Sequence, residues 1–479
     1  MRVLPRSTVA ATAVLLLTGT AGAVPAAGAV PPVEQPTARS PYDAGLSTPV
    51  EDSYYPSKGD PGVDTLHYGL RLGWYPQQRL LRGTATVTLR ATEDAAQLQL
   101  DLAGRLAVDR LTLDGKRVRF THTGKTLRVR APVRADRRYR LVVRYHGSPR
   151  PTPAPSERSD MVDGLGWHTE RDGQVWAMQE PFGAFTWYPV NDQPSDKALY
   201  DVRLNVPRPW VGVSNGRLVS RRTTERRTLT RFHSADPMAS YLVTVAIGPY
   251  RRATQKGPRG LPLTYWVPRK HPEYLKPLRK TPAALRFLES LFGPYPLDRA
   301  GVVVTPSDSA METQTLVTMG AEYFAPGNGR EVRETVLHEL AHQWYGDTVT
   351  PTDWRDLWMN EGMAMYAQAR WTVAQGWLSW RSWQRAFADP YWRETYGPPG
   401  RYDRDDFGQI NVYYSAAAMW DALRRQLGDD EFAALVRAWP QQHRNASVSR
   451  DDLVSWVEAR TGLELSAFFH EWLMSPTAP

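Results

Sequence analysis

The chain has 479 residues with an ordinary hydrophobic content of 42%, so two or three packed domains are expected. The formal net charge of +9 favours an anionic partner in principle. However, the arginines are scattered and no nucleic-acid-binding motif accompanies them, so we predict a basic solvated surface and no nucleic acid partner. The absence of cysteine excludes disulfides, thiol catalysis and a lipid attached through cysteine.

The beginning of the chain has the features of a secretory signal. Early arginines precede an apolar run over residues 10–17 that is too short to span a bilayer, and small-residue cleavage sequences end at Ala23 and Ala29. We predict a signal peptide over residues 1–29 and a disordered mature N-terminus, rich in Ala, Pro and Gly, over residues 30–50. No later run of about eighteen apolar residues exists, so the predicted protein is secreted and has no membrane anchor.

The next part of the chain alternates apolar and polar residues with the period of β-strands. This pattern starts near residue 64, and an Asp-Gly pair at 114–115 indicates a tight hairpin. Strands resume over residues 197–206 and 241–247. Many short strands separated by turns predict an antiparallel saddle or sandwich. We assign residues 51–253 to this N-terminal β domain.

After about residue 268 the apolar spacing becomes that of helices, so residues 254–479 are assigned to a mainly helical domain and the fold class is α+β. Within it we expect helices over 282–292, 331–345 and 360–374, a buried strand over 302–305, a loop over 397–409, helices from Ser415, and a helix N-cap at Ser449.

The helix over residues 331–345 carries the sequence His338-Glu-Leu-Ala-His342. Histidines four apart project from one helical face, and with a carboxylate they supply three ligands to zinc while leaving a fourth position for water. Glu361, nineteen residues after His342, is the candidate third ligand, and Glu339 is the candidate base for the water proton. The alternative is a surface helix with solvated histidines. The apolar surroundings disfavour it, since buried histidines need partners.

These residues resemble the gluzincin aminopeptidases of family M1. The resemblance is carried by His338-Glu-Leu-Ala-His-Gln-Trp-Tyr-Gly-Asp-Thr-Val349, Leu357-Trp-Met-Asn-Glu-Gly-Met-Ala364, Glu180-Pro181, Pro189-Val-Asn-Asp192 and Pro194-Ser-Asp-Lys197. It implies a saddle-like β domain, a thermolysin-like catalytic domain, an active site between them, one zinc ion per chain, and removal of single residues from peptides with a free N-terminus. Many members continue into a large helical domain, so the end at Pro479 predicts a short form with a more open cleft, and we expect a monomer.

The resemblance also implies roles for residues outside the zinc motif. It places the tyrosine that stabilises the oxyanion at Tyr413, with Tyr414 as the alternative, because Ser415-Ala416 replaces the family's Lys/Arg-Gly pair. The family's Gly-x-Met-Glu-Asn motif corresponds to residues 309–313. Ala310, Met311 and Glu312 are therefore predicted to bind substrate, and Glu180 is the second glutamate for the substrate ammonium.

Several alternatives stay open at this point. Asp347 and Asp356 either orient a zinc histidine or are surface acids. Trp344, Trp354 and Trp358 either line a substrate groove or pack in the core, and core packing is favoured. The effects of Ser309 and Thr313, which depart from the family motif, are undetermined.

The function also has alternatives. A thermolysin-type endopeptidase needs no ammonium-binding glutamates, and an inactive peptide-binding relative would be signalled by loss of Glu339 or of a ligand. Epoxide hydrolysis, known in one branch of the family, has no specific support in the sequence. Co²⁺ or Mn²⁺ can occupy the same ligand set, although mixed nitrogen and oxygen ligation fits zinc.

Overall fold

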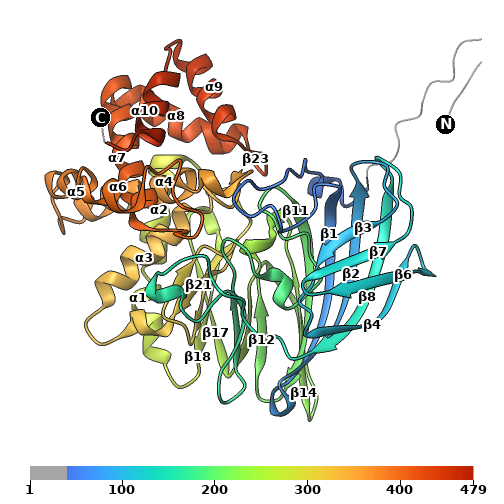
Figure 1. Ribbon diagram of the computed structural model, residues 1–479. Coiled ribbons are helices and arrows are strands. Elements are labelled where there is room, and N and C mark those ends of the chain that lie inside the picture. Colours follow the sequence, from blue (N-terminus) through green and yellow to red (C-terminus); the bar gives the residue numbers. More distant parts are fainter. Residues whose placement is uncertain (1–39, 478–479) are drawn as a thin grey trace, which may run out of the picture. The chain divides into compact units, whose positions relative to one another are not determined.

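The computed structural model describes residues 40–477 (Figure 1). The predicted signal peptide, residues 1–29, lies outside the described residues, as do residues 30–39 of the predicted disordered segment 30–50. The described end of that segment packs on the β domain instead. Gly45 is buried so close to the backbone of Leu66 that an added Cβ would lie 2.3 Å from its carbonyl oxygen. The prediction of disorder is therefore wrong for this part.

The N-terminal part is built around a large, mainly antiparallel sheet, coloured blue to green in Figure 1. Its strands follow in the order β13-β14-β11-β1-β2-β8-β4-β5, and β15 pairs with β11. Burial alternates along β2 (Leu80–Ala91) and β8 (Arg138–Gly147), because successive side chains of a strand point to opposite faces. The other strands are β1 (Val63–Tyr75), β4 (Leu106–Leu113), β5 (Lys116–Arg117), β11 (Lys197–Pro207), β13 (Arg217–Thr223), β14 (Arg227–His233) and β15 (Met238–Ala239).

Smaller sheets complete the β domain. One contains β3 (Leu98–Asp101), β7 (Thr126–Arg130) and β6 (Arg119–Thr123), and another contains β12 (Val211–Ser214), β16 (Val245–Gly248), β10 (Val175–Met178) and β9 (Gly166–Thr169). Asp114 and Gly115, with φ of 48° and 79°, join β4 to β5, as the Asp-Gly pair predicts.

The C-terminal part combines a five-stranded sheet with helices, so the α+β fold class is confirmed. The sheet has the order β17-β18-β19-β21-β20, and its strands are β17 (Tyr250–Lys256), β18 (Pro262–Pro268), β19 (Ala300–Thr305), β20 (Ala310–Met311) and β21 (Val317–Gly320). The short strands β22 (Thr350–Pro351) and β23 (Ser447–Val448) pair in parallel. The helices are α1 (Leu275–Leu278), α2 (Thr281–Phe292), α3 (Gly329–Ala341), α4 (Trp358–Ala374), α5 (Trp380–Phe387), α6 (Tyr391–Tyr396), α7 (Ile410–Leu427), α8 (Asp429–Gln442), α9 (Arg450–Thr461) and α10 (Ser466–Met474).

Several predicted boundaries differ from the structure. The helix predicted over 331–345 ends at Ala341, and the strand predicted over 241–247 is a 3₁₀ helix, Ser240–Leu242, followed by β16. β17 pairs with β18 over its whole length, so the division at residues 253 and 254 falls inside a strand of the second sheet. Helix α7 begins at Ile410 rather than at Ser415. By contrast, Ser449 caps α9 through a capping box with Asp452, as predicted.

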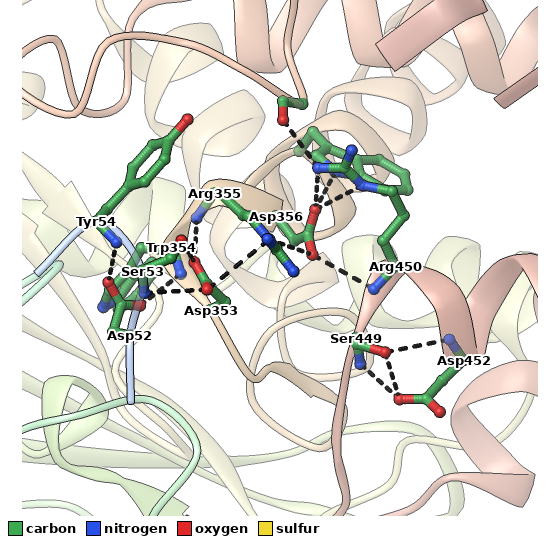
Figure 2. A network of polar contacts seen from close by, with 12 residues as sticks. Asp52, Ser53, Tyr54, Asp353, Trp354, Arg355, Asp356, Ser449, Arg450 and Asp452 are labelled. Atoms are coloured by element: carbon green, nitrogen blue, oxygen red, sulfur yellow. Dashed lines mark hydrogen bonds and ion pairs between the residues drawn. The ribbon is translucent and has the colours of Figure 1, made fainter. Parts of the chain in front are cut away.

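A network of polar contacts fixes the loop that precedes α4 (Figure 2). Asp52 accepts hydrogen bonds from the backbone of Tyr54 at 3.0 Å and of Trp354 at 2.7 Å. The hydroxyl of Ser53 donates to Asp353 at 3.0 Å. Burial and the nearby Asp353 raise the pKa of the Asp52 carboxyl to about 6. The N-terminal segment therefore holds the chain directly before the helix that carries Glu361.

A buried lysine makes a second connection of this kind. The ammonium of Lys197, on β11, donates to the backbone carbonyls of Asp347, Thr348 and Ala446 at 2.9 to 3.0 Å. Its N–H groups thus satisfy carbonyls that follow α3 and precede β23. Among the described residues, no helix is both long and apolar enough to cross a membrane.

Candidate active site

Helices α3 and α4 bring the predicted metal ligands together. α3 carries His338 and has His342 as its C-terminal cap, and α4 carries Glu361 in its first turn. Nε2 of His338 and Nε2 of His342 lie 3.2 and 3.3 Å from the same oxygen of Glu361. All three are buried, and their ligand atoms lie within 4.8 Å of one another. The geometry fits a single ion shared by these side chains.

The charges around this cluster also fit a bound cation. Burial and neighbouring carboxylates raise the pKa of the carboxyl groups of Glu180, Glu312 and Glu339. Burial would also raise the pKa of Glu361, but the two histidines outweigh it and hold that pKa below its usual range. Such a group of acids is stabilised by a cation, and two imidazole nitrogens with one carboxylate form a catalytic zinc site.

The orientation of the histidines leaves nitrogen atoms available for a metal. Nδ1 of His342 lies 3.1 Å from the carbonyl oxygen of Tyr345, to which it donates, so in the neutral ring it is Nε2 that has the free lone pair. Burial lowers the pKa of His338 and favours its neutral form. A backbone carbonyl therefore takes the orienting role that we considered for Asp347 or Asp356.

The two aspartates have other surroundings. Both carboxylate oxygens of Asp347 are buried without a hydrogen-bond partner among the described residues. Asp356 accepts a hydrogen bond from Arg450 at 2.9 Å (Figure 2). It also accepts one from the Trp358 indole at 3.0 Å. Asp356 thus joins α9 to the start of α4 and does not orient a histidine. The three tryptophans that we considered, at positions 344, 354 and 358, are all at most 1% exposed and pack in the core.

Glu339 and Tyr413 lie beside the metal ligands. Glu339 is on α3 between the histidines and lines the same cavity. The hydroxyl of Tyr413 donates to Glu361 at 3.1 Å, while the ring of Tyr414 packs against Phe387 with 5.5 Å between centroids. Tyr413 is therefore the tyrosine whose hydroxyl reaches the ligand set.

The two predicted ammonium-binding glutamates lie in the same cavity. One oxygen of Glu180 and one of Glu312 are buried without a hydrogen-bond partner among the described residues. Unpaired buried carboxylate oxygens are unfavourable. A cationic group that enters the cavity would satisfy them.

Comparison with known proteins identifies the family. The Peptidase M1 N-terminal domain model matches residues 64–242, and the Peptidase family M1 domain model matches residues 277–397. The crystal structure of an M1 zinc metallopeptidase from Deinococcus radiodurans aligns with a TM-score of 0.79 and 30% identity, over 90% of this chain and 98% of that chain. The chain belongs to peptidase family M1.

Curated M1 relatives are similar over most of this chain. The tricorn protease-interacting factor F2 of Thermoplasma acidophilum is 26% identical over 412 residues, which are 81% of this chain and 50% of the relative. Aminopeptidase N of Lactobacillus helveticus is 25% identical over 451 residues, which are 86% of this chain and 51% of the relative. This M1 chain thus spans about half the length of these curated relatives.

Two glutamine side chains help to hold Glu180 and Glu312 in place. Gln179, next to Glu180, donates to backbone carbonyls of residues 240 and 243 at 3.1 and 2.6 Å. Gln343, one residue after His342, donates to the carbonyl of Glu312 at 2.8 Å. The bonds of Gln179 anchor the chain next to Glu180 to residues 240 and 243. The bond of Gln343 anchors Glu312 to the segment that follows α3. Neither glutamine was among our predicted site residues.

The site opens into a cavity of about 620 Å³. The predicted substrate-binding segment Ala310, Met311 and Glu312 lines it, together with the metal ligands, Glu180, Glu339 and Tyr413. Its volume is in the range of small-ligand sites. The cavity is also lined by Arg158 and Asp160, which sequence reasoning missed because they lie in a loop that carries no motif.

Proposed function

We propose that this chain is a zinc-dependent aminopeptidase that hydrolyses the first peptide bond of peptides with a free N-terminus. The observation that carries the proposal is the pair of buried, unpartnered carboxylate oxygens of Glu180 and Glu312 in the cavity of the metal ligands. Two carboxylates at one end of a cavity suit the α-ammonium of a substrate. In support, a solved structure of the related Deinococcus radiodurans M1 metallopeptidase contains a Tyr-Ser-Ala substrate.

The reaction would divide among side chains of this chain. His338, His342 and Glu361 would hold the zinc ion, which supplies a Lewis acid and a water of lowered pKa. Glu339 would accept a proton from the attacking water and deliver it to the leaving amine.

Substrate placement and charge stabilisation would fall to other residues. Glu180 and Glu312 would hold the ammonium and so set the scissile bond one residue from the N-terminus. Tyr413 would donate a hydrogen bond from its hydroxyl to the oxyanion that develops on the scissile carbonyl. In support, all three side chains line the cavity.

The test is hydrolysis of chromogenic aminoacyl amides with free and with acetylated N-termini. We expect cleavage of the free-amine substrates alone, loss of activity in a chelator, and recovery with Zn²⁺. Cleavage of acetylated substrates or internal bonds would show a thermolysin-type endopeptidase. Binding of zinc and peptide without turnover would show an inactive relative.

We also propose that the protein is secreted as a monomer. The support for secretion is the charged, apolar and small-residue pattern over residues 1–29. N-terminal sequencing of the protein from culture medium tests this proposal, with a new N-terminus after Ala23 or Ala29 as the expected result. Light scattering of the purified protein measures its molar mass and so tests whether it is a monomer.

A further inference from the structure

An arginine from the β domain contacts the catalytic tyrosine. Arg158 directly precedes a short 3₁₀ helix, Ser159–Met161, and its side chain lines the cavity. Its Nη1 donates to the hydroxyl of Tyr413 at 2.9 Å and to the carbonyl of Gly408 at 2.8 Å. Gly408 lies in the loop that leads into α7. The arginine therefore fixes both the tyrosine hydroxyl and the start of the tyrosine's helix.

The other side of the guanidinium is held by Asp160. Nε and Nη2 of Arg158 donate to the two carboxylate oxygens at 3.0 and 2.7 Å, which is a bidentate pair. Asp160 also accepts a hydrogen bond from the hydroxyl of Ser309 at 2.7 Å. Ser309 stands where the family motif has glycine, and a glycine cannot make this bond. This chain thus connects its substrate segment to Arg158.

These contacts determine the direction of the tyrosine proton. Arginine is always charged and has no acceptor, so the oxygen of Tyr413 is the acceptor in their hydrogen bond. Its single O–H is then directed elsewhere, and in the structure it donates to Glu361 at 3.1 Å. A cationic donor also polarises the phenol and strengthens it as a donor.

Arg158 is poorly suited to bind substrate directly. Its N–H groups already donate to Asp160, Gly408 and Tyr413. Four of its five N–H groups therefore have protein partners. The arrangement is that of a side chain that holds another side chain.

We propose that Arg158 is a positioning residue for Tyr413, oriented by Asp160 and Ser309, which directs the tyrosine proton into the substrate cavity. The proposal rests on the proposed aminopeptidase function. It predicts that Arg158 affects turnover only through Tyr413. The substrate ammonium is held by other residues, so substrate affinity should be largely independent of Arg158.

A double-mutant cycle with Arg158→Met and Tyr413→Phe tests this proposal. We expect R158M to lower kcat about 10- to 100-fold, somewhat less than loss of an oxyanion donor, with KM changed less than about threefold. In the Y413F background R158M should lower kcat less than about twofold, because the hydroxyl that it positions is absent. An equal loss in both backgrounds, or a large rise in KM at unchanged kcat, would overturn the proposal.

A binding measurement gives a readout that does not depend on turnover. An uncleavable aminoalkyl phosphinate mimics the tetrahedral species, whereas a free amino acid mimics the product. R158M should weaken phosphinate binding by about the same factor as kcat/KM and leave amino acid binding within about twofold. Equal weakening of both ligands would mean a general disturbance of the site and would overturn the proposal.

Further variants serve as controls and alternatives. Arg128→Met, an exposed arginine on β7 that does not line the cavity, should behave as wild type. Arg158→Lys keeps the charge but not the fork geometry, so it should restore part of the lost kcat and serves in the cycle if R158M does not fold. Wild-type protein without any peptidase activity would contradict the proposed function, whereas active wild type with an additive cycle contradicts only the role of Arg158.

Discussion

Gly362 on α4 lies so close to Ala416 on α7 that a Cβ at position 362 would be 2.4 Å from the Ala416 Cβ. The residue before Gly362 is the candidate metal ligand Glu361, and Tyr413 lies one turn before Ala416. The close approach of the two helices therefore allows the 3.1 Å contact between the tyrosine hydroxyl and Glu361. The small residue Ala416, which departs from the family's Gly, still fits opposite a glycine.

Gly362→Ala should separate these helices and disturb the site. Neither the backbone of α7 nor the Ala416 methyl group can move without repacking, so we expect a loss of about 1 to 3 kcal/mol in the free energy of unfolding. We also expect kcat to fall at least about tenfold, because small displacements of catalytic groups are costly. Urea unfolding and steady-state kinetics measure the two effects.

Gly329→Ala is the matched control for this variant. Gly329 begins α3, and an added Cβ there has open space around it. Its unfolding free energy and kcat should be close to wild type. Normal stability and activity of G362A would show that the helices tolerate the methyl group.

Removal of the metal should lower the thermal stability as well as the activity. Binding of an ion to the folded state alone stabilises that state, and its removal leaves the acids around Glu361 without a cation. We expect a chelator to lower the Tm by several degrees and added Zn²⁺ to restore it. Glu361→Gln should make the Tm insensitive to both treatments. Equal Tm values for chelated and zinc-loaded wild type would contradict the proposed metal site.

The cluster of candidate metal ligands was predictable because the spacing of its residues is local. His338 and His342 are four apart on one helix, and the segment with Glu361 has a recognisable sequence. The structure places all three within reach of one ion. The alternation of buried and more exposed side chains along β2 was predictable for the same reason, because a strand shows its period in its own residues.

Other features depend on contacts between distant segments and were missed. Arg158 and Tyr413 are 255 residues apart, and no local pattern connects an arginine in a loop to a tyrosine on a helix. The strand β17 was missed because it is an edge strand whose side chains are mainly exposed. Its sequence therefore lacks the apolar alternation on which the prediction depends.

Glu339→Gln should remove most of the activity and leave the metal site intact. The amide has nearly the same shape as the carboxylate but cannot accept the proton of the attacking water. We expect kcat to fall at least about a thousandfold, with a zinc content like that of wild type by atomic absorption. Loss of zinc together with activity would mean that Glu339 also supports metal binding. Retained activity would assign the role of base to another residue.

We expect the buried ring of His168 to lower the stability of the folded protein at acidic pH. The ring of His168 is stacked on Trp176 with 3.7 Å between centroids, and its Nε2 lies 3.1 Å from the carbonyl of Gly164. Burial lowers its pKa from 6.5 to about 4. Between these pH values the unfolded chain binds a proton that the folded chain does not, so stability falls as the pH falls through this range.

The variant His168→Gln removes the titrating group and retains an N–H donor. As the pH falls from about 7 to 4, wild type should lose on the order of 3 kcal/mol more unfolding free energy than H168Q, because one pKa unit corresponds to about 1.4 kcal/mol. Urea unfolding at a series of pH values measures the difference. His470→Gln, an exposed histidine on α10, is the matched control and should show the wild-type pH dependence. Parallel curves for wild type and H168Q would show that His168 takes up its proton equally in the folded and unfolded states.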